Sequence, residues 1–167
     1  MSAATNFDAL EFRSALGRYA SGITVISGLD ATGPIGFTCQ SFYSVSIDPP
    51  LISFSVMKSS SSYPKIRATG KFAVNIMSEE QQWVANQFAR SGNDKFANVP
   101  WKPTAQNNPV IQGSLGWLDC SIWAEHDAGD HVIVIGQVHE IHTEQTGTQA
   151  PLVFFDAQYR TLKPSAS

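Results

Sequence analysis

Two clusters of hydroxyl side chains each follow a short apolar run in the first half of the sequence. The first cluster, named the elbow here, comprises residues 38–41 and reads Thr38-Cys39-Gln40-Ser41. The second, named the serine loop, comprises residues 58–62 and reads Lys58-Ser59-Ser60-Ser61-Ser62. Hydroxyls and free backbone N–H groups at strand ends can hold a phosphate or the polar edge of a planar ring. A single Ser or Thr at the end of a strand is more often only a turn residue. Two clusters joined by a stiff Pro49-Pro50 corner favour a ligand site.

A further candidate is His131, which follows Gly129-Asp130 at the centre of a predicted hairpin. Residues 127–130 read Asp-Ala-Gly-Asp between two apolar runs, and glycine supplies the positive φ that a tight turn needs. Taken alone, this pattern makes His131 the first residue of a strand after a turn, which is the simpler of its two interpretations.

The remaining histidines do not predict a metal site. His139 and His142 are three residues apart on a predicted strand, so they point to opposite faces and do not chelate one ion together. We interpret both as surface residues. The sequence also contains neither G-x-G-x-x-G nor a P-loop, so a nicotinamide dinucleotide, if used, is held in another way.

Composition indicates one domain that spans residues 1–167. Charged residues make up 15% of the chain, against about 25% in typical globular proteins, so we expect apolar surface buried in a second copy. A net charge of −3 without a basic run excludes a nucleic-acid partner. No apolar run approaches the roughly 20 residues of a membrane helix, and no secretory signal is found. Cys39 and Cys120 form no CxxC pair, which indicates thiols in a reducing, cytoplasmic location.

The apolar periodicity predicts many strands and few helices. Helices are expected after Asn6 up to Gly22, from Ser62 to Gly70, and from Ser78 to Arg90. Strands are expected at 23–26, 35–37, 45–47, 51–56, 72–76, 117–126, 131–144 and 151–155, followed by a tail at 159–167. The long segment 91–116 is rich in Asn, Pro and Gly, which is typical of a functional or disordered connection. Because the strands do not alternate with helices, a mainly antiparallel β-barrel with two or three peripheral helices is predicted.

The elbow and its continuation also resemble a known family. Residues 38–51, with the run SFYSVSIDPPL, are similar to the T-x-x-S-F-x-S-V-S-x-D-P-P-L signature of the flavin reductase-like split-barrel proteins. Gly129-Asp130-His131, followed by Gly136-Gln137-Val138, resembles the family's G-D-H motif and its G-x-V continuation. The resemblance extends from about Phe12 to about Leu162, and Cys39-Gln40 stands where many members carry Ala-Asn.

The resemblance implies an antiparallel split barrel, probable dimers with flavin near the subunit interface, and a set of site residues. His131 would lie near the nicotinamide side of the flavin and orient the nicotinamide. Lys95 would bind the flavin phosphate, and Phe96 would stack on a ring. The resemblance implies that Phe88 lies beside the flavin. An equally supported interpretation is that Phe88 packs in the core under its helix. The other implied flavin contacts are Thr38, Cys39, Gln40, Ser41, Ser46, Lys58, Ser60, Ser62, Gly129, Asp130 and Tyr159, with Arg13 a weaker candidate.

The function implied is NAD(P)H-dependent reduction of FMN or FAD, with the reduced flavin passed to a partner monooxygenase. Two alternatives stay open at this point. One is a flavoprotein of the same fold that keeps its FMN and transfers electrons to a protein or haem. The other is a non-enzymatic binding module on the same barrel, because one fold hosts many functions.

Overall fold

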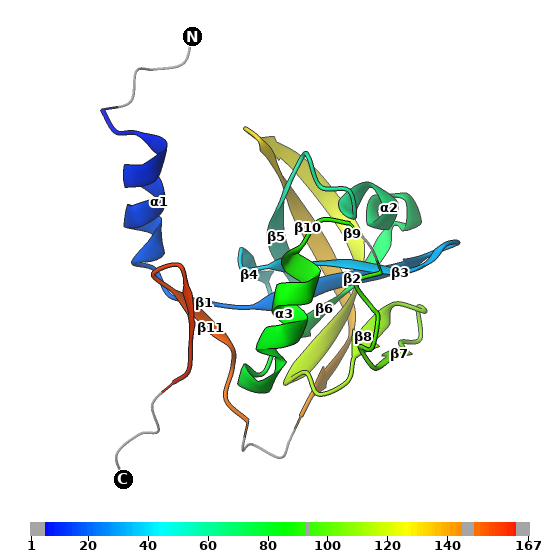
Figure 1. Cartoon of the computed structure of the whole chain (residues 1–167). Helices are drawn as coiled ribbons and strands as arrows, with labels where there is room; N and C mark the ends of the chain where they lie inside the picture. Colours follow the sequence, from blue (N-terminus) through cyan, green and yellow to red (C-terminus); the bar gives the residue numbers. More distant parts are fainter. Residues whose placement is uncertain (1–5, 93, 145–148, 163–167) are drawn as a thin grey trace.

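A curled seven-stranded antiparallel sheet forms the centre of the protein, seen here in a computed structural model that describes residues 6–92, 94–144 and 149–162 (Figure 1). Its strands follow the order β3 (Gly33–Cys39), β2 (Thr24–Asp30), β6 (Lys71–Ile76), β9 (Gly116–Ala128), β10 (His131–Thr143), β5 (Leu51–Met57) and β4 (Phe42–Ser46). Every neighbouring pair in this order is antiparallel.

Chain connectivity forces this sheet to curl. Its two edge strands, β3 and β4, are consecutive in the sequence and are separated only by Gln40 and Ser41. In a flat sheet, six spacings of about 4.8 Å would put these edges roughly 29 Å apart. The three peptide links from Cys39 to Phe42 reach only about 11 Å. The sheet therefore closes on itself and leaves a split between β3 and β4, which confirms the predicted antiparallel split barrel.

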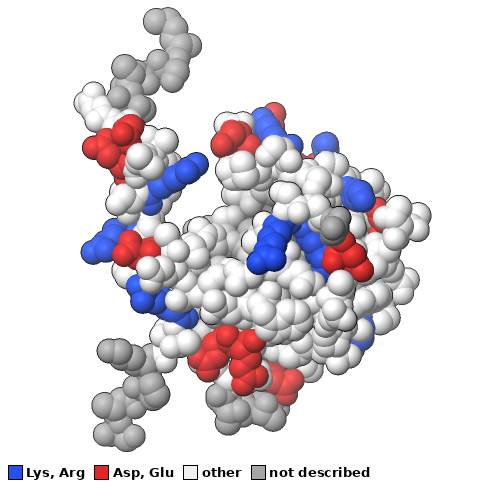
Figure 2. Space-filling view, viewed as in Figure 1, with Lys and Arg blue, Asp and Glu red and all other residues white. Residues whose placement is uncertain are grey.

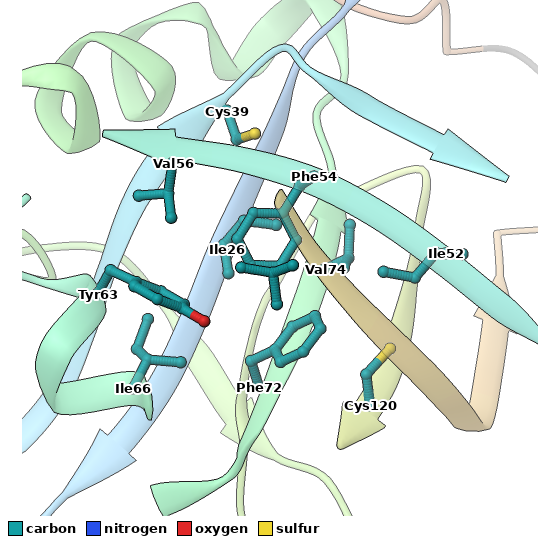
Figure 3. Packing of buried hydrophobic residues seen from close by; sticks show 11 residues of the cluster. Ile26, Cys39, Ile52, Phe54, Val56, Tyr63, Ile66, Phe72, Val74 and Cys120 are labelled. Atoms are coloured by element: carbon teal, nitrogen blue, oxygen red, sulfur yellow. The ribbon is translucent and has the colours of Figure 1, made fainter. Parts of the chain in front are cut away.

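Aromatic side chains fill the interior of the curled sheet (Figure 3). Phe54 of β5 meets Phe72 of β6 edge-to-face at 5.3 Å between ring centroids, and Tyr63 in the same manner at 6.1 Å. Gly136 of β10 leaves room for this packing, because a Cβ there would lie 2.5 Å from the Phe72 ring. Close packing of this kind fixes the curvature of the strands that carry the elbow.

Two helices cover the barrel, and their ends confirm the predicted signals. Helix α2 (Tyr63–Thr69) ends at Gly70, which adopts the left-handed conformation with φ of 71°. A 3₁₀ turn, η1 (Glu79–Gln81), precedes α3 (Gln82–Ala89), and the Ser78 N–H donates to the Gln81 side-chain oxygen at 3.2 Å at its start. Helix α3 buries Val84, Ala85 and Phe88 against the sheet.

The first helix differs from its prediction. Helix α1 (Ala9–Gly17) is capped by Asp8 and not by Asn6, because the Asp8 carboxylate accepts hydrogen bonds from the backbone N–H groups of Leu10 and Glu11 at 2.8 Å. It ends at Gly17, before the predicted Gly22. None of its residues is buried, and Figure 1 shows it standing apart from the barrel.

Two predicted irregular segments contain strands. Segment 91–116 holds the hairpin β7 (Trp101–Pro103) and β8 (Pro109–Ile111). The predicted tail holds β12 (Gln158–Arg160), which pairs with β11 (Val153–Phe155), and β11 pairs in turn with β1 (Ser21–Gly22). Strands of three residues or fewer carry too little periodic pattern to be detected in sequence.

The β9–β10 hairpin has the predicted turn, with Gly129 at φ of 65°. Its strands are the longest of the sheet at 13 residues each, and they place His131 at the start of β10 beside Met57 of β5. None of the helices in the described ranges has the length and apolar character to cross a bilayer.

Candidate active site

A cleft of about 440 Å³ lies at the split, and it gathers segments that are far apart in the sequence. Its walls come from the elbow, the serine loop, the end of α3 with the residues after it, and the start of β10. The predicted site residues that line it are Thr38, Cys39, Gln40, Ser41, Ser60, Ser62, Phe88, Lys95 and His131. Lining residues outside the prediction include Phe37, Ser55, Val56, Met57, Arg90 and Ser91.

Hydrogen bonds from two elbow hydroxyls attach the elbow to β5 and to α3. The Ser41 hydroxyl accepts a hydrogen bond from the Ser55 N–H at 2.9 Å and donates one to the Ser55 carbonyl at 3.0 Å. The Thr38 hydroxyl donates to the Ala85 carbonyl of α3 at 2.6 Å. Both hydroxyls therefore shape the cleft, and the exposed Gln40 side chain forms no hydrogen bond with described residues.

Cys39 lies at the floor of the cleft and is 5% exposed. Its sulfur is 3.4 Å from the Ser41 hydroxyl oxygen. Burial raises the pKa of the thiol, since the surroundings disfavour a thiolate. Cys39 and Cys120 are both free and buried, so each acts as a small apolar side chain.

Lys95 is a half-buried cation without a carboxylate partner among the described residues. Its ammonium donates to the carbonyls of Gly36 and Phe88, each at 3.2 Å, and lies 3.5 Å from the Ser62 hydroxyl. Burial lowers its pKa because desolvation penalises the charged form. A cation held by neutral acceptors retains its attraction for an anionic ligand.

The serine loop adds donors beside this cation. The Ser60 hydroxyl accepts from the Tyr63 N–H at 3.2 Å and so caps the start of α2. The hydroxyls of Ser59 and Ser61 form no hydrogen bond with any described residue. Arg90 also lines the cleft, and no lining residue is acidic. Figure 2 shows charged side chains of both signs scattered over this face, with a basic group near the middle and an acidic group beside it. This end of the cleft therefore suits a phosphate.

His131 faces the cleft from the hairpin, held by its neighbour. Its Nδ1 is 2.7 Å from the Asp130 carboxylate, and this hydrogen bond is the main reason that the pKa of Asp130 is lowered. With Nδ1–H donating to Asp130, a neutral ring presents Nε2 as an acceptor. Gly129 and Asp130 thus position His131 without lining the cleft themselves.

Four other predicted residues lie elsewhere. Lys58 forms an ion pair with Asp127 at 3.0 Å on the neighbouring side of the hairpin, because β9 brings a carboxylate there. Ser46 ends β4 opposite Leu51. Tyr159 packs edge-to-face on Phe154 at 5.3 Å. Phe96 is 6% exposed and packs behind the cleft against Phe88 at 4.8 Å.

Phe88 is fully buried in the helix core, as the second of its two interpretations expects. It forms part of the wall of the cleft. Its close approach to β3 requires Gly36, where a Cβ would lie 2.8 Å from the Phe88 ring. Ser55 and Met57 escaped prediction, although strand alternation puts them on one face of β5, beside Ser41 and His131. That alternation was the signal available in the sequence.

The arrangement fits a flavin mononucleotide unit. The volume lies within the 300–1,000 Å³ of ordinary ligand sites. Phe37, Val56 and Met57 offer apolar surface for a planar ring, while Lys95 and Arg90 offer positive charge for a phosphate. His131 lines the same cleft.

Comparisons with known proteins agree with this geometry. The chain is 40% identical over 157 residues to the reductase subunit HsaB of a flavin-dependent monooxygenase from Mycobacterium tuberculosis, covering 94% of this chain and 84% of that protein. The crystal structure of nitrilotriacetate monooxygenase component B from Mycobacterium thermoresistibile matches with a TM-score of 0.92 at 39% identity, covering 95% of this chain and 88% of that one.

A third similar protein is the NADH:FAD oxidoreductase SgcE6 of Streptomyces globisporus, solved in complex with NAD and FAD fragments. It matches with a TM-score of 0.90 at 28% identity, over the full length of both chains. The model of the flavin reductase like domain matches residues 16–163. This chain is a member of the flavin reductase-like domain family.

Proposed function

We propose that the protein is an NAD(P)H-dependent flavin reductase that supplies reduced FMN or FAD to a partner monooxygenase. The observation that supports it best is the cleft at the split, where an apolar wall, two cations and His131 meet without a carboxylate. The similar proteins, a monooxygenase reductase subunit and an NADH:FAD oxidoreductase, support the same reaction. The proposal includes a single domain over 1–167, no nucleic-acid or membrane partner, and a cytoplasmic location, which the two free thiols favour.

The chain contributes binding and orientation to this reaction. A flavin in the cleft supplies the hydride acceptor, and a nicotinamide nucleotide supplies the hydride. Lys95, Arg90 and the serine loop would hold the phosphate, while Phe37, Val56 and Met57 pack the ring. Fixing two rings about 3–3.5 Å apart accounts for much of the rate in such a reaction. The elbow would face the ring edge, where its N–H donors would stabilise developing negative charge. Ser46, Lys58 and Tyr159 lie outside the cleft of one chain and have no part in this account.

His131 acts in this proposal as an orienting residue. The Nδ1–H donates to the Asp130 carboxylate, so a neutral ring accepts at Nε2, where a carboxamide N–H of the nicotinamide can donate. Its exposure, 39% of the side chain, leaves the ring accessible from the cleft. No proton transfer is assigned to it, because hydride transfer needs none from the protein at this position.

The proposal also includes a homodimer. Helix α1 is nine residues long, below the length of about 12–15 residues at which isolated helices become even marginally stable. The helix and the residue before its cap nevertheless expose apolar side chains by 51–74%, at Phe7, Leu10, Phe12 and Leu16. Its end is tied to the C-terminal hairpin by the Asp156 N–H to Gly17 carbonyl bond at 2.9 Å. An exposed apolar surface of this kind is typical of a protein interface. A second copy of the chain is the partner available wherever the protein is present.

The function is tested by following NADH and NADPH oxidation with riboflavin, FMN or FAD added in turn. We expect little oxidation without added flavin and turnover with it, because a flavin that leaves the cleft is a substrate. A protein that oxidises neither nucleotide with any flavin contradicts the proposal. A protein purified with firmly bound flavin and no turnover of added flavin points to electron transfer instead.

Replacing Lys95 with Gln should weaken FMN binding roughly tenfold or more, the worth of a charged hydrogen bond. Riboflavin, which lacks the phosphate, should bind the variant as it binds wild type. Since the pKa of Lys95 is lowered, FMN affinity should fall as pH rises through that pKa, and riboflavin affinity should not follow. Fluorescence titration measures both, with the exposed Lys102→Gln as the control. Equal losses for both flavins would show that Lys95 does not meet the phosphate.

Replacing His131 with Ala should lower kcat/KM for the nicotinamide about ten- to a hundredfold, equivalent to about 1.4–2.7 kcal/mol. The Kd for flavin should hardly change, since other segments hold it. Steady-state kinetics at saturating flavin tests this, with the exposed His126→Ala on the adjacent strand as the matched control. Loss of flavin with unaltered nicotinamide kinetics would reverse the assigned roles, and no change in either quantity would make His131 a turn residue.

Light scattering at micromolar concentration should give twice the chain mass of 18.1 kDa. The double variant Leu10→Glu/Leu16→Glu should shift the protein toward monomer, because charges would then lie in the interface. Ile141→Glu, which alters an equally exposed apolar residue of β10, serves as control and should stay dimeric. A wild-type protein that elutes and scatters as an 18.1 kDa species refutes the dimer.

A further inference from the structure

A second cleft of about 760 Å³ adjoins the active-site cleft on the other side of the serine loop. It lies between the β2–β3 turn, the start of α2 and the segment around Lys95. Among its lining residues are Pro34, Ile35, Lys65, Asp94, Phe96 and Trp101. None of these six residues lines the active-site cleft, so the ring-binding role proposed above leaves this space unexplained.

The two clefts share Ser61, Ser62 and Lys95. The Lys95 ammonium lies 3.5 Å from the Ser62 hydroxyl oxygen and 3.2 Å from the Gly36 carbonyl oxygen, at the border between them. A phosphate that binds these groups therefore lies at the entrance to the second cleft. A ligand that continues beyond this phosphate has space there, whereas one that ends at the phosphate leaves the space to solvent.

The walls of the second cleft suit a second phosphate and an aromatic base. The Trp101 indole is partly exposed, and Phe96 holds it edge-to-face at 6.1 Å with 74° between the ring planes. Pro34 and Ile35 add apolar surface. Lys65, exposed on α2, adds a cation, while the Asp94 carboxylate accepts from the Phe96 N–H at 3.0 Å. A rigid indole face beside a cation matches the needs of a stacked base joined to a phosphate.

We infer that the second cleft binds the adenosine monophosphate half of FAD, so that this protein selects FAD over FMN. The inference rests on the proposed function, because it extends the phosphate position assigned to Lys95. Stacking on one aromatic side chain is enough for a roughly tenfold preference for the dinucleotide.

The test compares Kd for FMN and FAD by calorimetry in the absence of nicotinamide. Wild type should bind FAD about tenfold more tightly, and Trp101→Ala should reduce the ratio of the two Kd values roughly tenfold. Trp83→Ala removes an exposed tryptophan of α3 that lines neither cleft, and should keep the wild-type ratio. Because Trp101 also packs on Phe96, Lys65→Gln provides a second variant on the exposed side, with a smaller reduction expected.

Equal Kd values for FMN and FAD in wild type overturn the inference and leave the reductase proposal intact if added flavin still supports NADH oxidation. A protein that binds neither flavin overturns both. If Trp101→Ala and Lys65→Gln keep the ratio but raise KM for NADH, the cleft takes the adenosine half of the nicotinamide dinucleotide, and the inference is wrong.

Discussion

The Ser41 hydroxyl is the contact that fastens the elbow, the short link that forces the sheet to curl, to β5. It bonds both backbone groups of Ser55 at 2.9 and 3.0 Å, one position beyond the last β4–β5 backbone pair, Phe42 with Phe54. A side chain thereby continues the ladder while the backbone turns away toward β3. The same hydroxyl lies 3.4 Å from the Cys39 sulfur at the floor of the cleft. The same Ser41 side chain therefore holds the elbow that links the two edge strands and lies at the floor of the cleft.

The electrostatics of the cleft follow from what surrounds the split. Backbone carbonyls of β3 and α3 hold the Lys95 ammonium, and the acidic residues nearby are engaged elsewhere. Asp127 pairs with Lys58, and Asp130 with His131. The carboxylates are used to position side chains at the rim, and the interior of the cleft retains uncompensated positive charge. An enzyme whose cofactors carry out the chemistry needs this kind of environment more than it needs a proton donor.

Local sequence patterns were sufficient to predict turns and helix ends, which depend on residues close together in the chain. Gly129 in the hairpin, Ser78 at the N-cap position before η1 and Gly70 at the end of α2 all lie where predicted. The family resemblance supplied the barrel and most of the cleft. Contacts between distant segments could not be read from local patterns. Lys58 turns away because β9 places Asp127 beside it, and Tyr159 packs on Phe154 through a strand pair too short to read from sequence.

The split also has a kinetic meaning. Residues on either side of it are neighbours in the chain, yet β3 and β4 occupy opposite edges of the sheet. They do not pair with each other as a hairpin, and we expect them to come together only after β2, β6, β9, β10 and β5 have paired between them. Such non-local order is slow, because loop-closure entropy is lost before the contacts form. The elbow is therefore among the last parts of the chain to acquire its native geometry, and a chain competent to bind ligand there has already completed its sheet.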